Sequence, residues 1–173
     1  MSAPAGVRGR KSLRDMVLSL GVVLAVVGIV VAFEHRGGPG IRVIDPAQTY
    51  AGARNVAAYP VLLPHLPAGW RATSATNEES EGRLTMRVGW VTPTGQYAQL
   101  VESDRPAVEV FDRWLSPGLR PAGSVDVGGV PWQRLPAPQK GDLAIARTGG
   151  KVTYLVSGSA GLPELQTLAG SLR

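Results

Sequence analysis

The 173-residue sequence contains no cysteine and only two histidines, His35 and His65. Without cysteine, the chain has no disulfide framework, thiol nucleophile, thiolate zinc site or iron–sulfur cluster. Two histidines without a partner at helical spacing do not make a zinc site, which needs three or four converging ligands. We therefore expect no metal and no cofactor, and a fold that is stable through its apolar core alone.

Recognisable enzyme motifs are also scarce. The run from Ser157 to Gly161 weakly resembles the G-x-S-x-G nucleophile elbow, but a serine occupies the first glycine position and no histidine lies nearby in the sequence. Glu78, Glu79 and Glu81 form an acidic run that is typical of a solvated loop rather than of paired catalytic carboxylates. Phosphate-binding loops and dinucleotide-binding glycine patterns are missing. We therefore predict that the protein is not an enzyme.

Basic charge is concentrated in the first 33 residues rather than in the remainder of the chain. The formal net charge is +5, and residues 1–33 carry four basic residues against one acidic residue. Residues 34–173 carry fourteen basic and twelve acidic residues. A nucleic-acid-binding domain usually concentrates basic side chains on its folded surface. This charge distribution therefore argues against nucleic acid as a partner.

One long apolar run contains no charged residue. It extends from Met16 to Phe33, and as a helix it would be ~27 Å long, close to the ~30 Å hydrocarbon layer of a bilayer. The basic tail, residues 1–15, precedes it and favours a cytoplasmic N-terminus. A cleaved signal peptide is the alternative, with Val30 and Ala32 before the cleavage site, but signal h-regions are shorter, ~7–15 residues. We expect residues 16–33 to be a single-pass transmembrane helix in the lipid bilayer of the cell membrane.

Small residues recur along this apolar run at the spacing of one helix face. Such residues let two helix backbones approach closely in lipid, where apolar side chains alone do not drive association. The pattern predicts a weak homodimer through the transmembrane helix, although alanine and glycine are frequent throughout the chain and composition alone produces such a stripe. The residues concerned are Gly21, Ala25, Gly28 and Ala32.

The chain beyond the apolar run divides into a linker and a domain. Residues 34–58 begin with a glycine-rich stretch and contain a short predicted helix after Asp45 and Pro46, which suit a helix start. Repeated prolines then lead into residues 59–173, which we expect to be the extracytoplasmic domain. The domain should fold without help from the linker.

The domain sequence predicts an antiparallel sheet of about seven strands. Leu84, Met86, Val88 and Trp90 alternate with smaller or polar residues, as in a half-buried strand. Gly-Gly pairs mark two of the tight turns, and Asp104 suits the N-cap of a helix over residues 107–115. Short connections favour an α+β fold with the helices packed on one face. The remaining strands are expected from Trp70 and over residues 97–103, 124–127, 131–135, 142–148 and 151–157, with a last helix over 163–172.

Four tryptophans raise the question of a carbohydrate or lipid platform. Aromatic side chains more often fill small cores, and Trp90 and Trp114 fall on predicted core faces. Trp70 and Trp132 begin strands, so we predict these two as surface contacts.

Several short motifs occur in an order that resembles a known family. They are Arg14-Asp15-Met16, Asp45-Pro46, Tyr59-Pro60-Val61, Leu66 to Trp70, Gly89 to Thr92, Gly129 to Trp132, and Tyr154 to Leu172. The sequence resembles an actinobacterial family of small single-pass membrane proteins known only as a domain of unknown function. The resemblance covers residues 11–173. It implies a membrane address and an α+β outer domain, and it supplies no catalytic residues.

These observations favour a non-enzymatic binding or scaffolding module of the cell envelope. Its partner would be an unknown envelope protein or a cell-wall component. The alternative is a carrier of an apolar, lipid-like ligand held between the sheet and the helices, which would need a large internal pocket.

Overall fold

The structure is a computed structural model that describes residues 16–27, 42–136, 139 and 141–172. The chain forms two units, Met1–Ile41 and Arg42–Arg173. In the first unit, residues 16–27 are helical. No helix in the described residues has both the length and the apolar character needed to cross a membrane. Residues 28–33, the rest of the predicted span, lie outside the described residues.

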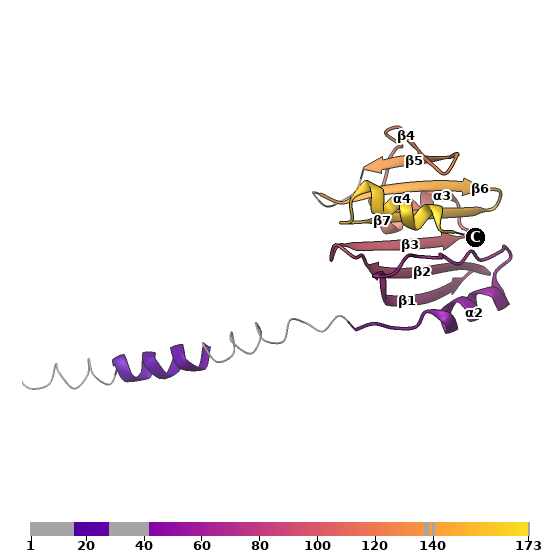
Figure 1. Ribbon diagram of the computed structural model, residues 1–173. Coiled ribbons are helices and arrows are strands. Elements are labelled where there is room, and N and C mark those ends of the chain that lie inside the picture. The colour runs from indigo at the N-terminus through magenta and orange to yellow at the C-terminus, as the bar shows by residue number, and fades with distance from the viewer. Residues whose placement is uncertain (1–15, 28–41, 137–138, 140, 173) are drawn as a thin grey trace, which may run out of the picture. The chain divides into compact units, whose positions relative to one another are not determined.

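The second unit contains a seven-stranded antiparallel sheet in the order β1-β2-β3-β7-β6-β5-β4 (Figure 1). The central pair is β3 and β7, which are brought together although a helix and three strands separate them in the sequence. The predicted antiparallel sheet is therefore confirmed. The strands are β1 (Arg71–Ser80), β2 (Arg83–Val91), β3 (Tyr97–Ser103), β4 (Ser124–Val127), β5 (Val130–Pro136), β6 (Leu143–Gly149) and β7 (Val152–Gly158).

Three helices of the second unit cover both faces of this sheet. They are α2 (Ala47–Val56), α3 (Ala107–Trp114) and α4 (Leu162–Gly170). Helices α2 and α4 pack into one apolar cluster, whereas α3 packs into a second cluster on the opposite face. Figure 1 shows α4 in front of the sheet and α3 behind it. The prediction that the helices lie on one face is therefore wrong.

The central strands explain why both faces need a cover. Successive side chains of a strand point to opposite faces of the sheet. Val156 of β7 belongs to the cluster under α2 and α4, and its neighbour Leu155 belongs to the cluster under α3. In β3, Leu100 likewise belongs to the cluster under α2 and α4, and Val101 belongs to the cluster under α3. Phe111 of α3 is buried in the second cluster and joins the helix to that face of the sheet.

The folded unit begins earlier than the sequence indicates. Tyr50 and Ala53 of α2 are buried in the first cluster, and the Ile44 N–H donates to the Ala72 carbonyl at 2.9 Å. The Asp45 carboxylate accepts a hydrogen bond from the Ala47 N–H at 2.9 Å at the start of α2. Residues 42–58 are thus part of the fold rather than a linker before it.

Asp104 and the acidic run also differ from expectation. Asp104 does not cap α3, because its carboxylate accepts the Leu84 N–H of β2 at 2.9 Å. The acidic run is not a loop, since Glu78 and Glu79 lie on β1 and Glu81 alone occupies the turn into β2, with a φ of 57°. Strand β1 extends further than its polar sequence indicates because it pairs with β2 along its length.

Candidate functional site

Trp132 and Trp114 do not lie where the sequence predicts, whereas Trp90 is buried in the apolar core as expected. Trp132 is only 1 % exposed and belongs to the apolar cluster under α4, so the prediction of a surface contact at Trp132 is wrong. The Trp132 side chain lies on the face of β5 that α4 covers. Trp70 is partly buried against the same cluster. Trp114, which the sequence places in the core, is partly buried against the other cluster and borders a surface cavity.

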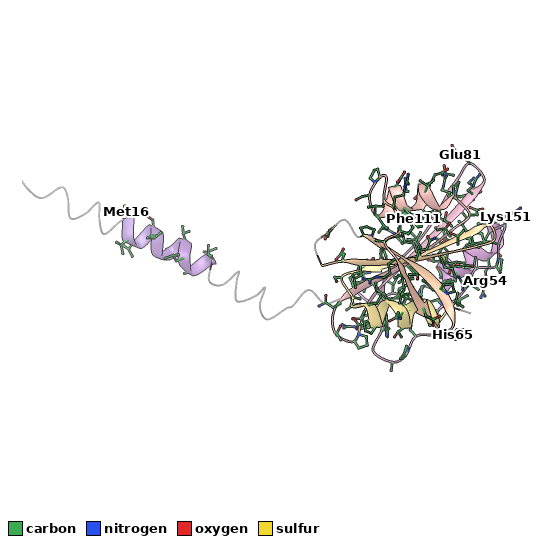
Figure 2. All side chains as sticks on the ribbon, turned by 90° about the horizontal axis from the view of Figure 1, so that it is seen from above. Met16, Arg54, His65, Glu81, Phe111 and Lys151 are labelled. Carbon is green, nitrogen blue, oxygen red and sulfur yellow. The ribbon has the colours of Figure 1, made fainter. Side chains whose placement is uncertain are left out.

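We call this cavity the Trp114 hollow. Its volume is about 320 Å³. It lies where the start of β3, the end of β7 and the end of α3 meet. In Figure 2, the side chains of this unit surround the sheet, which is viewed from above. The residues that line the hollow include Tyr97, Gln99, Trp114, Asp142, Ser157 and Ser159.

A hydrogen-bonded pair of side chains forms part of this hollow. Gln99 of β3 is in register with Ser157 of β7, and Gln99 Nε2 donates to Ser157 Oγ at 3.1 Å. The Tyr97 hydroxyl lies 3.5 Å from Gln99 Oε1. Strand pairing and hydrogen bonding together hold these polar groups in place.

Tyr97 is held at the rim by backbone contacts with the chain that follows β7. Ser159 Oγ accepts the Tyr97 N–H at 3.0 Å, and the Tyr97 carbonyl accepts the Ala160 N–H at 3.0 Å. Gly158 has a φ of 149°, and a Cβ at this position would overlap the Tyr97 carbonyl oxygen. A Cβ at Gly89 would overlap the Tyr97 hydroxyl. The serine-rich run therefore anchors the start of β3, which agrees with its interpretation as a turn rather than a nucleophile elbow.

The Trp114 ring is held by two guanidinium groups. The Arg87 guanidinium carbon, from β2, lies 4.6 Å from the ring centroid, and that of Arg113 lies at 5.5 Å. Both distances fall within the range of cation–π attraction. Neither arginine lines the hollow, and Asp142 is the one carboxylate among the described lining residues. The described lining of the hollow therefore offers amide, hydroxyl and carboxylate groups next to two aromatic rings, and it includes no basic side chain.

A second polar group lies inside the core on the other face of β3. Glu102 is fully buried, and its Oε2 accepts the Leu62 N–H at 3.1 Å. Burial raises its pKa to about 8, and its Oε1 has no hydrogen-bond partner among the described residues. Burial and the charge of Glu102 also raise the pKa of Tyr50 and Tyr59 far above the usual range. A group with such a pKa is a candidate for catalysis only where substrate reaches it, and Glu102 is enclosed.

The structure describes only some of the predicted helix–helix contact residues and one of the two histidines. Gly21 and Ala25 lie in the helix over residues 16–27, whereas Gly28 and Ala32 lie outside the described residues. His65 lies at the surface of the second unit, and His35 is outside the described residues. Within the described part of the chain, no three His, Asp or Glu side chains converge as metal ligands would.

Fold and site together define a small α+β domain with a filled core and a hydrogen-bonding hollow at its surface. The chain belongs to the family described as "Protein of unknown function (DUF4245)", whose sequence model matches residues 8–172. The predicted membership of a family of unknown function is therefore confirmed. No curated protein and no solved structure matches the chain.

Proposed function

We propose that this chain is a membrane-anchored, extracytoplasmic module of the cell envelope that acts by binding rather than by catalysis. The Trp114 hollow carries the proposal, because it places ordered hydrogen-bonding groups and aromatic rings together at the surface. Small-molecule sites combine these features. The partner is a cell-wall component or another envelope protein, and the family resemblance supports an actinobacterial source.

The anchor rests on the first unit. The large apolar side chains of the helix over residues 16–27 are more than half exposed all around it, and such a helix calls for an apolar environment. The apolar run continues in the sequence to Phe33 and follows a basic tail, which supports a cytoplasmic N-terminus. Full-length protein should resist carbonate extraction, and external protease should digest the chain after Arg36. A soluble form that begins near Phe33 would instead indicate a cleaved signal peptide.

The packing favours binding at the surface over transport of an apolar ligand. The space between the sheet and α4 is occupied by fully buried side chains, among them Leu100, Val156, Leu165 and Leu168. A lipid carrier would need that space for its ligand. The interior of the described domain therefore does not favour the carrier.

Site-specific photocrosslinking in intact membranes tests the binding proposal. Benzoylphenylalanine in place of Tyr97 keeps an aromatic ring at the rim of the hollow. Val130 at the start of β5 is also exposed but does not line the hollow, so the same substitution there is the control. We expect a discrete crosslinked product from position 97 and none from position 130. Identical patterns from the two positions would contradict binding at the hollow.

We also propose that the anchor self-associates weakly through its small residues. Gly21 and Ala25 are one helical turn apart, and the sequence continues the stripe with Gly28 and Ala32. Replacing Gly21 and Gly28 together by isoleucine should abolish self-association in a membrane reporter assay. A wild-type span that behaves as a monomeric control would show that the stripe is compositional.

A further inference from the structure

We propose that the ligand of the Trp114 hollow is an uncharged sugar unit of a cell-wall glycan, an inference that rests on the proposed binding function. The hollow has polar side chains that can hydrogen-bond to the hydroxyl groups of a sugar. It also has aromatic side chains that can pack against the apolar C–H face of a sugar ring. The fold holds Gln99, Tyr97 and Trp114 in position for this role.

The polar groups have hydrogen-bonding capacity to spare. Gln99 uses one amide N–H on Ser157 and accepts the Tyr97 hydroxyl at its carbonyl oxygen, so it retains a second N–H and one lone pair on that oxygen. Asp142 adds a carboxylate that accepts hydrogen bonds. A sugar hydroxyl both donates and accepts, so neighbouring hydroxyls match an amide and a carboxylate that line the same hollow. Because Gln99 is already hydrogen-bonded to Ser157, its amide loses little conformational freedom when a ligand binds.

The aromatic side chains provide the second chemistry. Tyr97 and Trp114 both line the hollow, and the faces of their rings carry partial negative charge that attracts the partly positive C–H groups of a sugar. Arg87 holds the Trp114 ring from β2, and Gly89 leaves the space that the Tyr97 hydroxyl occupies. Both rings are therefore positioned before the ligand arrives.

The charge of the described lining and the size of the hollow argue against other ligand classes. No lysine or arginine is among the described side chains that line the hollow, and Asp142 would repel a phosphate or a nucleic acid. A volume of about 320 Å³ is at the small end of ligand sites. It suits a single sugar ring or two rather than a peptide helix.

Fluorescence titration of the full-length chain in lipid nanodiscs tests the inference. The probe is the neutral β-linked tetramer of N-acetylglucosamine, and inorganic phosphate is the anionic comparison. We expect a saturable change in tryptophan emission with the sugar and none with phosphate. Trp114→Phe should remove most of the change while leaving binding measurable by calorimetry, because the aromatic face is retained.

Two variants separate recognition from folding. Gln99→Ala should weaken sugar binding by roughly tenfold, because it removes a hydrogen-bonding group from the hollow. Val108→Ala changes an exposed residue of α3 outside the hollow and should leave the affinity unchanged. Circular dichroism of each variant establishes that the fold is intact.

Three outcomes would overturn the sugar assignment: no saturable binding up to about 10 mM, equal binding by folded Gln99→Ala, or equal binding of phosphate. If the sugar fails but Tyr97 crosslinking still gives its product, the binding function stands and the ligand class is wrong. If both experiments fail, both proposals fall.

Discussion

Glu102 Oε2 accepts a hydrogen bond from the Leu62 backbone N–H at 3.1 Å, although forty positions separate the two residues. The backbone carbonyl of Glu102 also accepts a hydrogen bond from the Tyr59 hydroxyl, at 3.2 Å. Glu102 of β3 therefore makes two hydrogen bonds to the segment between α2 and β1. Because Glu102 is fully buried, the protonation state of its carboxyl group affects the stability of the whole domain.

We predict that the domain loses stability as pH rises from weakly acidic to weakly basic values. Burial raises the folded-state pKa of Glu102 from 4.5 to about 8, so the folded state holds the proton more tightly than the unfolded chain. This contribution is fully present below about pH 4.5 and is lost as pH rises through about 8. The free energy of unfolding should fall by up to about 1.4 kcal/mol per pH unit across that window. Urea unfolding at a series of pH values measures the slope.

Glu102→Gln should remove most of that slope, because glutamine has no proton to lose in this range. Glu79→Gln is the matched control, since Glu79 is exposed on β1 and its substitution should leave the slope intact. A wild-type free energy of unfolding that is level between pH 5 and 8 would show that Glu102 does not hold its proton as proposed.

Phe111→Ala should destabilise the domain by about 3–5 kcal/mol. Its side chain is buried between α3 and the sheet, next to Val101 and Leu155, so truncation removes apolar contact and leaves a cavity. Val108→Ala, on the exposed side of the same helix, should cost less than about 0.5 kcal/mol. Denaturant unfolding compares the two variants. A loss below about 1 kcal/mol for Phe111→Ala would mean that α3 contributes little to the core.

Gly158→Ala should cost more than about 2 kcal/mol. Gly158 has a φ of 149°, and an added Cβ would overlap the Tyr97 carbonyl oxygen. Alanine would therefore strain the backbone and push β3 away from the end of β7. Gly149→Ala serves as the control, because a Cβ at that strand position meets only an ordinary contact with Tyr154 at 3.8 Å. Thermal unfolding should show a large decrease in midpoint for the first variant alone.

The strands could be predicted because their local sequence carries the pattern, whereas the layering of the helices was missed. Val156 and Leu155 are adjacent in a continuous apolar run, which is typical of a strand buried on both faces. From that run, the sequence could have indicated that helices cover both faces of the sheet. The sequence position of Glu102 also carried information, since it shares a strand face with Ala98 and Leu100 and so points into the core.

The candidate site was harder to predict because strand pairing creates it. Gln99 and Ser157 are 58 positions apart, and nothing in either local sequence indicates that β3 and β7 are neighbours. The assignments of Trp132 and Trp114 failed for a related reason. Trp132 lies near the start of β5, but only the position of α4 decides that it is buried, and Trp114 lies at a helix end where its ring is partly uncovered.

The folded domain begins before α2, at residue 42. A fragment of residues 42–173 should be more stable than one of residues 59–173, by at least about 3 kcal/mol, because the shorter fragment loses the buried Tyr50 and Ala53. It also loses the hydrogen bond from Asn77 Nδ2 to the Thr49 carbonyl at 2.7 Å. Denaturant unfolding followed by circular dichroism measures the difference.

A pair of substitutions in the longer fragment isolates the contribution of α2 packing. Tyr50→Ala should account for much of the loss, because it empties space in the core. Tyr50→Phe keeps the ring and removes a buried hydroxyl that has no hydrogen-bond partner among the described residues, so it should be neutral or slightly stabilising. Equal stability of the two fragments would place the start of the folded domain after α2, as the sequence alone indicates. A large loss in Tyr50→Phe would instead show that the hydroxyl is satisfied in solution.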